Sequence, residues 1–274
     1  MQQAAYESAA PALEGPPTGA AEAARLRFQQ FVAMREVSPS VADDLFGVLT
    51  TSRVVLLLDD SGSMNTSVSD PLRPAAPPST RWAELLRLCG CVVDIVTSTT
   101  PAGVDCYFLN RPPVLGVCAP EQVAPAFNYL PPQGGTPLIR ALQQIFATYG
   151  PEAEAGRRVI VVVITDGEPS DGSPEQLFAV LQQQRHQNIH VSIAECNDNE
   201  DEMAYLDGWD KRLLNFDNSD DFSMELMRVR AANGPRFRFT YLDYAVKIIL
   251  GSTMRRYFNE DQALGGGEGC CAIA

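Results

Sequence analysis

The chain has 274 residues, 45% of them hydrophobic, and carries a formal charge of −13 at pH 7. This length and apolar content predict one domain of roughly 200–250 residues with extensions. The strongly acidic composition argues against a nucleic-acid partner, because such a chain repels phosphate groups.

Residues 1–49 are expected to form an N-terminal extension. Residues 1–20 are rich in Ala, Pro and Gly and are predicted to lack fixed structure, whereas residues 21–36 have a rough apolar face that predicts a helix. We see no apolar segment typical of a secretory signal and no run long enough to span a membrane. Seven cysteines, an odd number, indicate thiols in a reducing compartment. We therefore expect a cytoplasmic protein without a transmembrane span.

Beyond the extension, apolar strands alternate with amphipathic helices. Strands are predicted at 53–58, 104–109, 114–117, 158–165 and 189–194, and helices at 82–96, 137–146, from 173 onward, 219–232 and 241–250. The Ser/Pro-rich stretch 65–79 is expected to be an exposed loop. This alternation predicts right-handed βαβ units, and therefore an α/β fold whose mostly parallel sheet is covered by helices on both faces.

The strand at 53–58 ends in a series of carboxylates and hydroxyls. Asp59, Ser61 and Ser63 alternate, so their side chains can point the same way in an extended or gently turning backbone. Such hard oxygen donors suit Mg²⁺, which prefers near-octahedral oxygen ligands. Asp60 is expected to support the site or to face solvent. The alternative is a simple turn capped by the Asp59 and Asp60 side chains.

Two later loops also carry oxygen donors. Thr136 lies in the sequence Gly-Gly-Thr-Pro and is predicted to cap a helix that has Pro137 at its first position. Asp166 directly follows the strand at 158–165. Ligands of open α/β sheets bind beyond the carboxyl ends of the strands, so the three loops together predict one site.

These motifs, in this order, resemble the von Willebrand factor type A (vWA) domain. The metal-ion-dependent adhesion site of that family has the pattern D-x-S-x-S, followed by a Thr and then an Asp. The matching residues here are Asp59, Ser61, Ser63, Thr136 and Asp166. The resemblance covers roughly residues 50–258 and implies a Rossmann-like fold with a central, mostly parallel sheet of about six strands.

The resemblance also implies a metal-dependent protein-interaction module. Its ion, Mg²⁺ with Mn²⁺ or Ca²⁺ as alternatives, would accept an Asp or Glu carboxylate from a protein partner. We do not expect an enzyme, because no general base, nucleophile or nucleotide-binding loop accompanies the oxygen ligands. Two alternative functions remain. One is an Mg²⁺-dependent phosphoryl or ester hydrolase, supported by the acidic pair Asp59-Asp60. The other is a metal-free intracellular scaffold.

The last segment, 259–274, is Gly-rich and ends in Cys271-Ala272-Ile273-Ala274. This ending fits the C-a-a-X pattern with a terminal residue associated with farnesylation, so Cys271 is a predicted lipidation site. A single prenyl chain holds a protein only marginally at a membrane, and Cys270 is the candidate for a second lipid. We expect peripheral association with the cytoplasmic face of a membrane; the alternative is a plain flexible tail.

Overall fold

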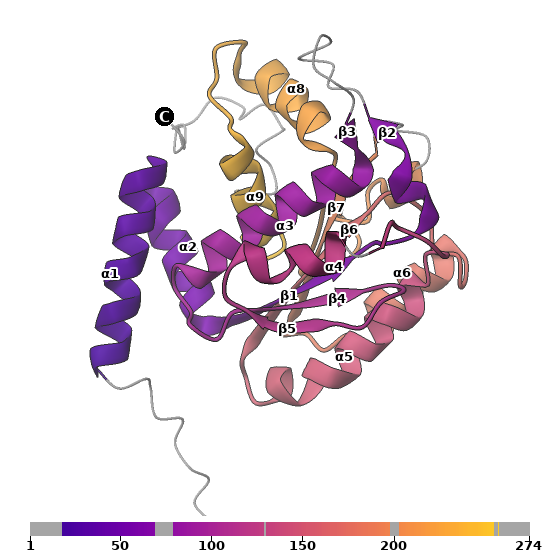
Figure 1. Cartoon of the computed structure of the whole chain (residues 1–274), viewed down its shortest axis with the longest axis horizontal. Coiled ribbons are helices and arrows are strands. Elements are labelled where there is room, and N and C mark those ends of the chain that lie inside the picture. The colour runs from indigo at the N-terminus through magenta and orange to yellow at the C-terminus, as the bar shows by residue number, and fades with distance from the viewer. Residues whose placement is uncertain (1–17, 69–78, 129, 198–202, 255–256, 258–274) are drawn as a thin grey trace, which may run out of the picture.

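A six-stranded sheet lies at the centre of the fold (Figure 1). In spatial order it comprises β5 (Val114–Val117), β4 (Val104–Phe108), β1 (Ser52–Leu58), β6 (Arg158–Thr165), β7 (Ile189–Glu195) and β8 (Phe216–Ser219). All neighbours are parallel except β4 and β5, which are antiparallel. The computed structural model describes residues 18–68, 79–128, 130–197, 203–254 and 257. The predicted α/β class with a mostly parallel sheet is confirmed.

The burial of the strands explains their continuous apolar sequences. The whole of β6 after its first residue is buried, because helices cover both faces of the sheet. It pairs with β1 so that Leu58 lies opposite Ile164. Strand β8 was not predicted, because its sequence Phe-Asp-Asn-Ser has no apolar or β-branched run. It forms by pairing with β7, with Phe216 opposite Val191.

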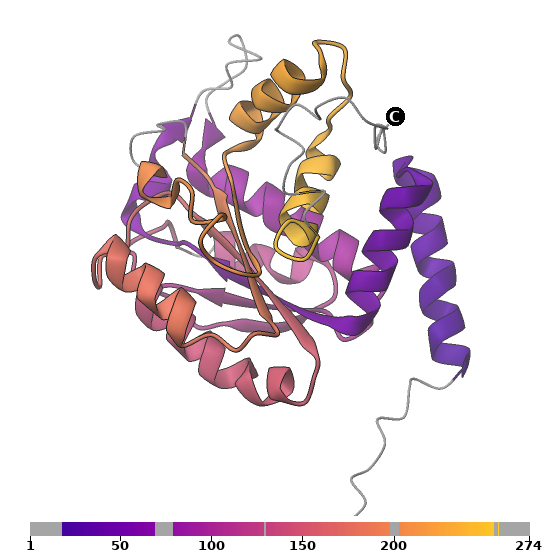
Figure 2. The same cartoon turned by 180° about the vertical axis from the view of Figure 1, so that it is seen from behind.

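Helices are divided between the two faces (Figure 1, Figure 2). One face carries α5 (Leu138–Glu154) and α6 (Pro174–Gln183). The other carries α2 (Pro39–Thr51), α3 (Arg81–Thr97), α4 (Ala124–Asn128), α8 (Phe222–Asn233) and α9 (Tyr241–Leu250). Helix α1 (Thr18–Arg35) lies on the outer side of α2, where Phe28 packs against Phe46 (Figure 1, Figure 2). A small hairpin of β2 (Ser67–Val68) and β3 (Ser79–Thr80) leads into α3. Helices α3 and α9 agree closely with the segments predicted at 82–96 and 241–250.

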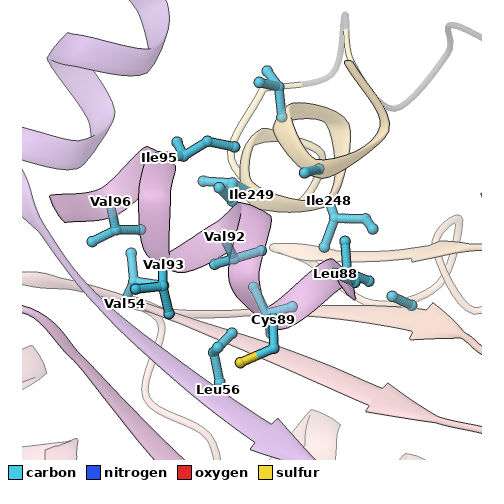
Figure 3. Close-up of a cluster of buried hydrophobic side chains, with 14 of the residues drawn as sticks. Val54, Leu56, Leu88, Cys89, Val92, Val93, Ile95, Val96, Ile248 and Ile249 are labelled. Carbon is cyan, nitrogen blue, oxygen red and sulfur yellow. The ribbon is translucent and has the colours of Figure 1, made fainter. Parts of the chain in front are cut away.

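One apolar cluster fixes α3 and α9 against the sheet (Figure 3). Val54 and Leu56 of β1 contribute from below, and Ile248 and Ile249 contribute from α9. The α3 side chains in this cluster are Leu88, Cys89, Val92, Val93, Ile95 and Val96. Such close packing leaves little freedom for α3, so residues at its first turn have a defined position relative to the sheet.

The N-terminal extension contains two helices. Helix α1 corresponds to the helix predicted at 21–36, and α2 was not predicted. The buried face of α2 includes Leu45 and Val48, and the Tyr257 hydroxyl donates to Asp44 Oδ2 at 2.7 Å. Residues 1–17 and 258–274, including the predicted lipidation sites Cys270 and Cys271, lie outside the described residues. Within the described helices, we find none with the length and apolar character that a membrane crossing needs.

Candidate metal centre

The loops after β1 and β6 lie at the point where the sheet order reverses. From β1 the chain first builds β4 and β5 on one side, and then crosses to form β6 on the other side of β1. The two loops therefore emerge side by side at the carboxyl ends of neighbouring parallel strands, which is where open α/β sheets bind ligands. The Asp59 amide donates to Ile164 O at 2.9 Å, so the first loop begins in contact with the end of β6.

Four of the five predicted ligands form one hydrogen-bonded network. Asp59 Oδ1 accepts a hydrogen bond from the Ser61 amide at 2.9 Å. The Ser61 and Ser63 hydroxyl oxygens are 2.9 Å apart, and Ser63 Oγ donates to Asp166 Oδ1 at 2.9 Å. Ser61 is extended, but a short 3-10 helix, Gly62–Asn65, follows it. This turn, rather than a continuing extended backbone, brings Ser63 to Asp166.

The loop that contains Thr136 lies against the first loop. The Gly62 amide donates to Gly134 O at 3.0 Å, and the Gln133 amide donates to Asp60 O at 2.8 Å. Gly134 has a φ of +95°, and a Cβ at this position would lie 2.6 Å from Asn110 Oδ1. A residue with a side chain would therefore be strained by both its backbone and its contact. Gly134 thus allows the loop that contains Thr136 to approach Asn110 closely.

The prediction that Thr136 caps a helix is wrong by one residue. Helix α5 begins at Leu138, and Pro137 is its N-cap residue with no side-chain cap. The ψ of 58° at Pro137 is not helical, so the first turn starts later than the sequence pattern suggests. Asp171 takes the capping role, since its carboxylate accepts from two amides at the start of α5. In the described part of the chain, the Thr136 hydroxyl makes no hydrogen bond.

The third loop holds Thr136 in place through residues that the sequence analysis missed. The Thr136 amide donates to Ser170 Oγ at 2.8 Å, and the Ser170 amide donates to Thr136 O at 2.9 Å. Asp171, which caps α5 from the same loop, was not predicted either. No local signal identifies either residue, because each bonds to a segment about thirty positions away in the sequence.

The carboxylates of the site are almost completely removed from solvent. Asp59 and Asp166 are each 1% exposed. Burial raises the pKa of Asp59 to about 6, and the negative charge of Asp166 adds to this rise. Hydrogen bonds from the Ser61 amide and from Thr165 Oγ1, which lies 2.6 Å from Asp59 Oδ2, act in the opposite direction. A cation beside Asp59 would favour its ionised form.

Asp60 is buried and does not face solvent, which corrects one of its two expected roles. It is 0% exposed, and its Oδ1 accepts from the Asn110 amide at 2.8 Å. Its Oδ2 forms an ion pair with Arg111 Nε at 2.9 Å. The guanidinium of Arg111 also lies 5.1 Å from the centre of the Trp82 ring. Asp60 therefore fixes the segment after β4, which is the supporting role that we also considered.

A second guanidinium lies against Asp166. Arg81, at the start of α3, donates from Nη1 to Asp166 Oδ2 at 2.9 Å and from Nη2 to Asn197 Oδ1 at 2.6 Å. Asn197 in turn donates to Asp166 O at 2.9 Å. The sequence analysis did not identify Arg81, since nothing in a single arginine after a Ser/Pro-rich stretch indicates a long-range ion pair.

The donor chemistry fits a hard divalent cation. Two buried carboxylates and a set of serine and threonine hydroxyls supply oxygen atoms only, which is what Mg²⁺, Mn²⁺ and Ca²⁺ prefer. Among the described residues, the candidate centre included, no group of three or more His, Cys, Asp or Glu side chains could hold a metal ion. The candidate centre offers two buried carboxylates, and its other candidate oxygen donors are hydroxyl groups.

The strand order and the position of the D-x-S-x-S loop at the reversal point give this chain a vWA-like α/β fold, as its sequence implied. No protein-family model matches the sequence, and a search of curated proteins finds no match. Among solved structures, the SpRpn10 VWA domain is similar with a TM-score of 0.45 and 12% identity, over 72% of this chain and 94% of that one.

Two further structures are similar to this chain with lower TM-scores. Manganese-loaded TRAP protein of Plasmodium vivax has a TM-score of 0.43 and 13% identity, over 65% of this chain and 72% of that one. The ArnB paralog VWA2 of Sulfolobus acidocaldarius has a TM-score of 0.36 and 14% identity, over 67% of this chain and 45% of that one. At such values the similarity concerns fold alone, and no activity is transferred from it.

Proposed function

We propose that this chain is a metal-dependent protein-interaction module and not an enzyme. In this proposal Asp59, Ser61, Ser63, Thr136 and Asp166 hold Mg²⁺, with Mn²⁺ or Ca²⁺ as alternatives, and a partner protein supplies an Asp or Glu carboxylate. The observation that carries the proposal is the network that joins Ser61, Ser63 and Asp166 beside the buried Asp59. It lies where the sheet order reverses, which is the expected ligand position in such a fold.

The proposed metal ligands, which combine neutral hydroxyls with two carboxylates, suit an ion that also binds a carboxylate of a partner protein. Ser61, Ser63 and Thr136 are neutral, so only Asp59 and Asp166 would offset the charge of the ion. An ion with few anionic ligands, when bound, supplies an electrophilic centre for a further carboxylate. The chain's own residues would position the ion, exclude water from Asp59 and Asp166, and leave the partner side of the site to solvent.

Replacing Asp59 by alanine is expected to abolish saturable Mg²⁺ binding in isothermal titration calorimetry. The variant loses the carboxylate that orders the first loop and one of two negative charges at the centre. The matched control is Asp43→Ala, which removes an exposed carboxylate from α2 and should leave Mg²⁺ affinity unchanged. Circular dichroism would verify that both variants fold. Equal Mg²⁺ affinity in the Asp59 variant and the wild type would refute the assignment.

A metal-free scaffold is the second candidate, and the Arg81–Asp166 ion pair favours it. The guanidinium offsets one buried carboxylate without any metal ion, so the loops could present a fixed surface on their own. Affinity capture with and without a chelator separates the two candidates. Partner binding that persists in excess chelator supports the scaffold, and binding that is lost supports the metal-dependent module.

The hydrolase alternative gains no support from the site. A phosphoryl-transfer site of the haloacid-dehalogenase type needs a D-x-D start, and position 61 is serine. Such a site also needs a lysine near the carboxylates, but Lys247 lies in α9 in a buried ion pair with Glu225, and Lys211 is an exposed residue between β7 and β8. We therefore propose no catalytic step.

We further propose that Cys271 is prenylated and that Cys270 is a second lipid site, so that the protein associates with the cytoplasmic face of a membrane. The terminal C-a-a-X sequence carries this part of the proposal. In fractionated eukaryotic cells, Cys271→Ser is expected to move the protein from the membrane fraction to the soluble fraction. Cys118→Ser, which changes an exposed thiol in the domain, is the control. A wild type without a lipid adduct in intact-mass measurement would contradict the proposal.

A further inference from the structure

Arg81 brings a permanent positive charge to the proposed metal centre. Arg81 is 6% exposed, and its guanidinium lies between the Asp166 carboxylate and the Asn197 amide. The planar guanidinium of an arginine carries one positive charge and donates hydrogen bonds only. The same Asp166 carboxylate accepts from Ser63 through its other oxygen. One carboxylate is therefore shared between the proposed metal ligands and a resident cation.

The position of Arg81 is fixed by its surroundings. It is the first residue of α3, and its amide donates to Thr66 O at 3.0 Å, just beyond the loop that carries Ser63. Helix α3 is held against the sheet by the apolar cluster it shares with β1 and α9 (Figure 3). Arg81 therefore extends from a firmly packed helix, and its buried guanidinium is held next to Asp166.

A count of buried charges shows what this arrangement does. The first and third loops hold three buried carboxylates, those of Asp59, Asp60 and Asp166. Arg111 pairs with Asp60, and Arg81 pairs with Asp166. The sum is one negative charge, and without Arg81 it would be two. A divalent ion at the centre would be repelled by Arg81 and would share Asp166 with it, and this repulsion is strong where water is excluded.

We propose that Arg81 acts as a built-in counter-charge, which keeps the loops assembled when no ion is bound and lowers the affinity of the centre for divalent cations. This inference depends on the proposed function, because it concerns the same centre. Arg81 is not a ligand in this account. It sets the affinity through its charge on Asp166, so that the ion and the guanidinium compete for one carboxylate.

The test is an Mg²⁺ titration of wild type, Arg81→Gln and Arg81→Lys by calorimetry. Arg81→Gln should bind Mg²⁺ at least about tenfold more tightly, because a like charge next to the ion has been removed. Arg81→Lys keeps the charge and should stay close to wild type. Arg87→Gln removes an exposed guanidinium from the same helix and is the matched control, with no expected change. A residue with only a structural role would weaken binding when replaced, and could not strengthen it.

In Arg81→Gln the buried Asp166 carboxylate loses the positive charge that offsets it, which is expected to lower the stability of the variant. Thermal melting of Arg81→Gln is therefore also measured at increasing Mg²⁺ concentration. A variant that is unstable alone but regains a cooperative transition with Mg²⁺ supports the inference, since the ion then replaces the guanidinium. A variant that Mg²⁺ cannot restore, or one that binds no better than wild type, overturns it. Binding by Arg81→Gln alone supports the inference while contradicting metal binding by the wild type. Absence of binding in both proteins overturns both proposals.

Discussion

Replacing Lys247 by methionine is expected to lower the free energy of unfolding by about 3–5 kcal/mol. Lys247 in α9 is 2% exposed and forms an ion pair with Glu225 in α8, which is 1% exposed. Methionine has a similar volume but no charge, so the Glu225 carboxylate would stay buried without the ammonium group that offsets it. The cost of that buried charge, rather than lost packing, sets the size of the effect. Urea unfolding at pH 7 measures it.

The double variant Lys247→Met with Glu225→Met is expected to recover most of this loss, because well-packed apolar side chains can replace a buried ion pair at little cost. Arg238→Met is the surface control. It removes an ion pair with Glu36 in which both side chains are largely exposed, and its effect should stay below about 1 kcal/mol. A Lys247→Met variant as stable as wild type would mean that the pair contributes nothing to holding α8 and α9 together.

Replacing Glu195 by glutamine is expected to stabilise the protein increasingly as the pH rises from 5 to 8, reaching about 3 kcal/mol. Burial raises the pKa of Glu195 to about 8, and the nearby carboxylates of Asp220 and Asp207 add to it. A hydrogen bond with Asn218 and the charge of Arg228 act in the opposite direction. The native state therefore holds a proton on Glu195 that the unfolded chain has released.

The sign of the effect follows from this difference in bound protons. Because the pKa is higher in the folded protein, the contribution of Glu195 to stability is fully present at low pH and is lost as the pH rises toward 8. Glutamine stays neutral at every pH and removes this loss. Chemical denaturation at several pH values gives the difference, with Glu154→Gln, an exposed carboxylate at the end of α5, as the control. If the difference in unfolding free energy between Glu195→Gln and wild type did not change with pH, the raised pKa of Glu195 in the folded protein would be contradicted.

The strongly periodic segments were the most predictable part of the fold. The apolar runs of β1 and β6 and the stripes of α3 and α9 lie close to the predicted bounds, because burial between helices or against a sheet leaves a direct pattern in the sequence. Strand β8 and helix α2 were not predicted. The polar sequence of β8 forms a strand only because the edge of β7 is available, and tertiary pairing of this kind overrides local preference.

The sequence by itself determined the α/β class and four residues that the structure joins through hydrogen bonds, namely Asp59, Ser61, Ser63 and Asp166. Their types and their places after apolar strands are local properties, and a parallel sheet brings the ends of its strands to one edge. Only the tertiary structure shows which positively charged side chains lie next to the acidic residues of the site. Arg81 and Arg111 reach Asp166 and Asp60 from segments separated in sequence by 85 and about fifty residues. Such ion pairs depend on how helices and loops pack, and packing leaves no periodic signal in the chain.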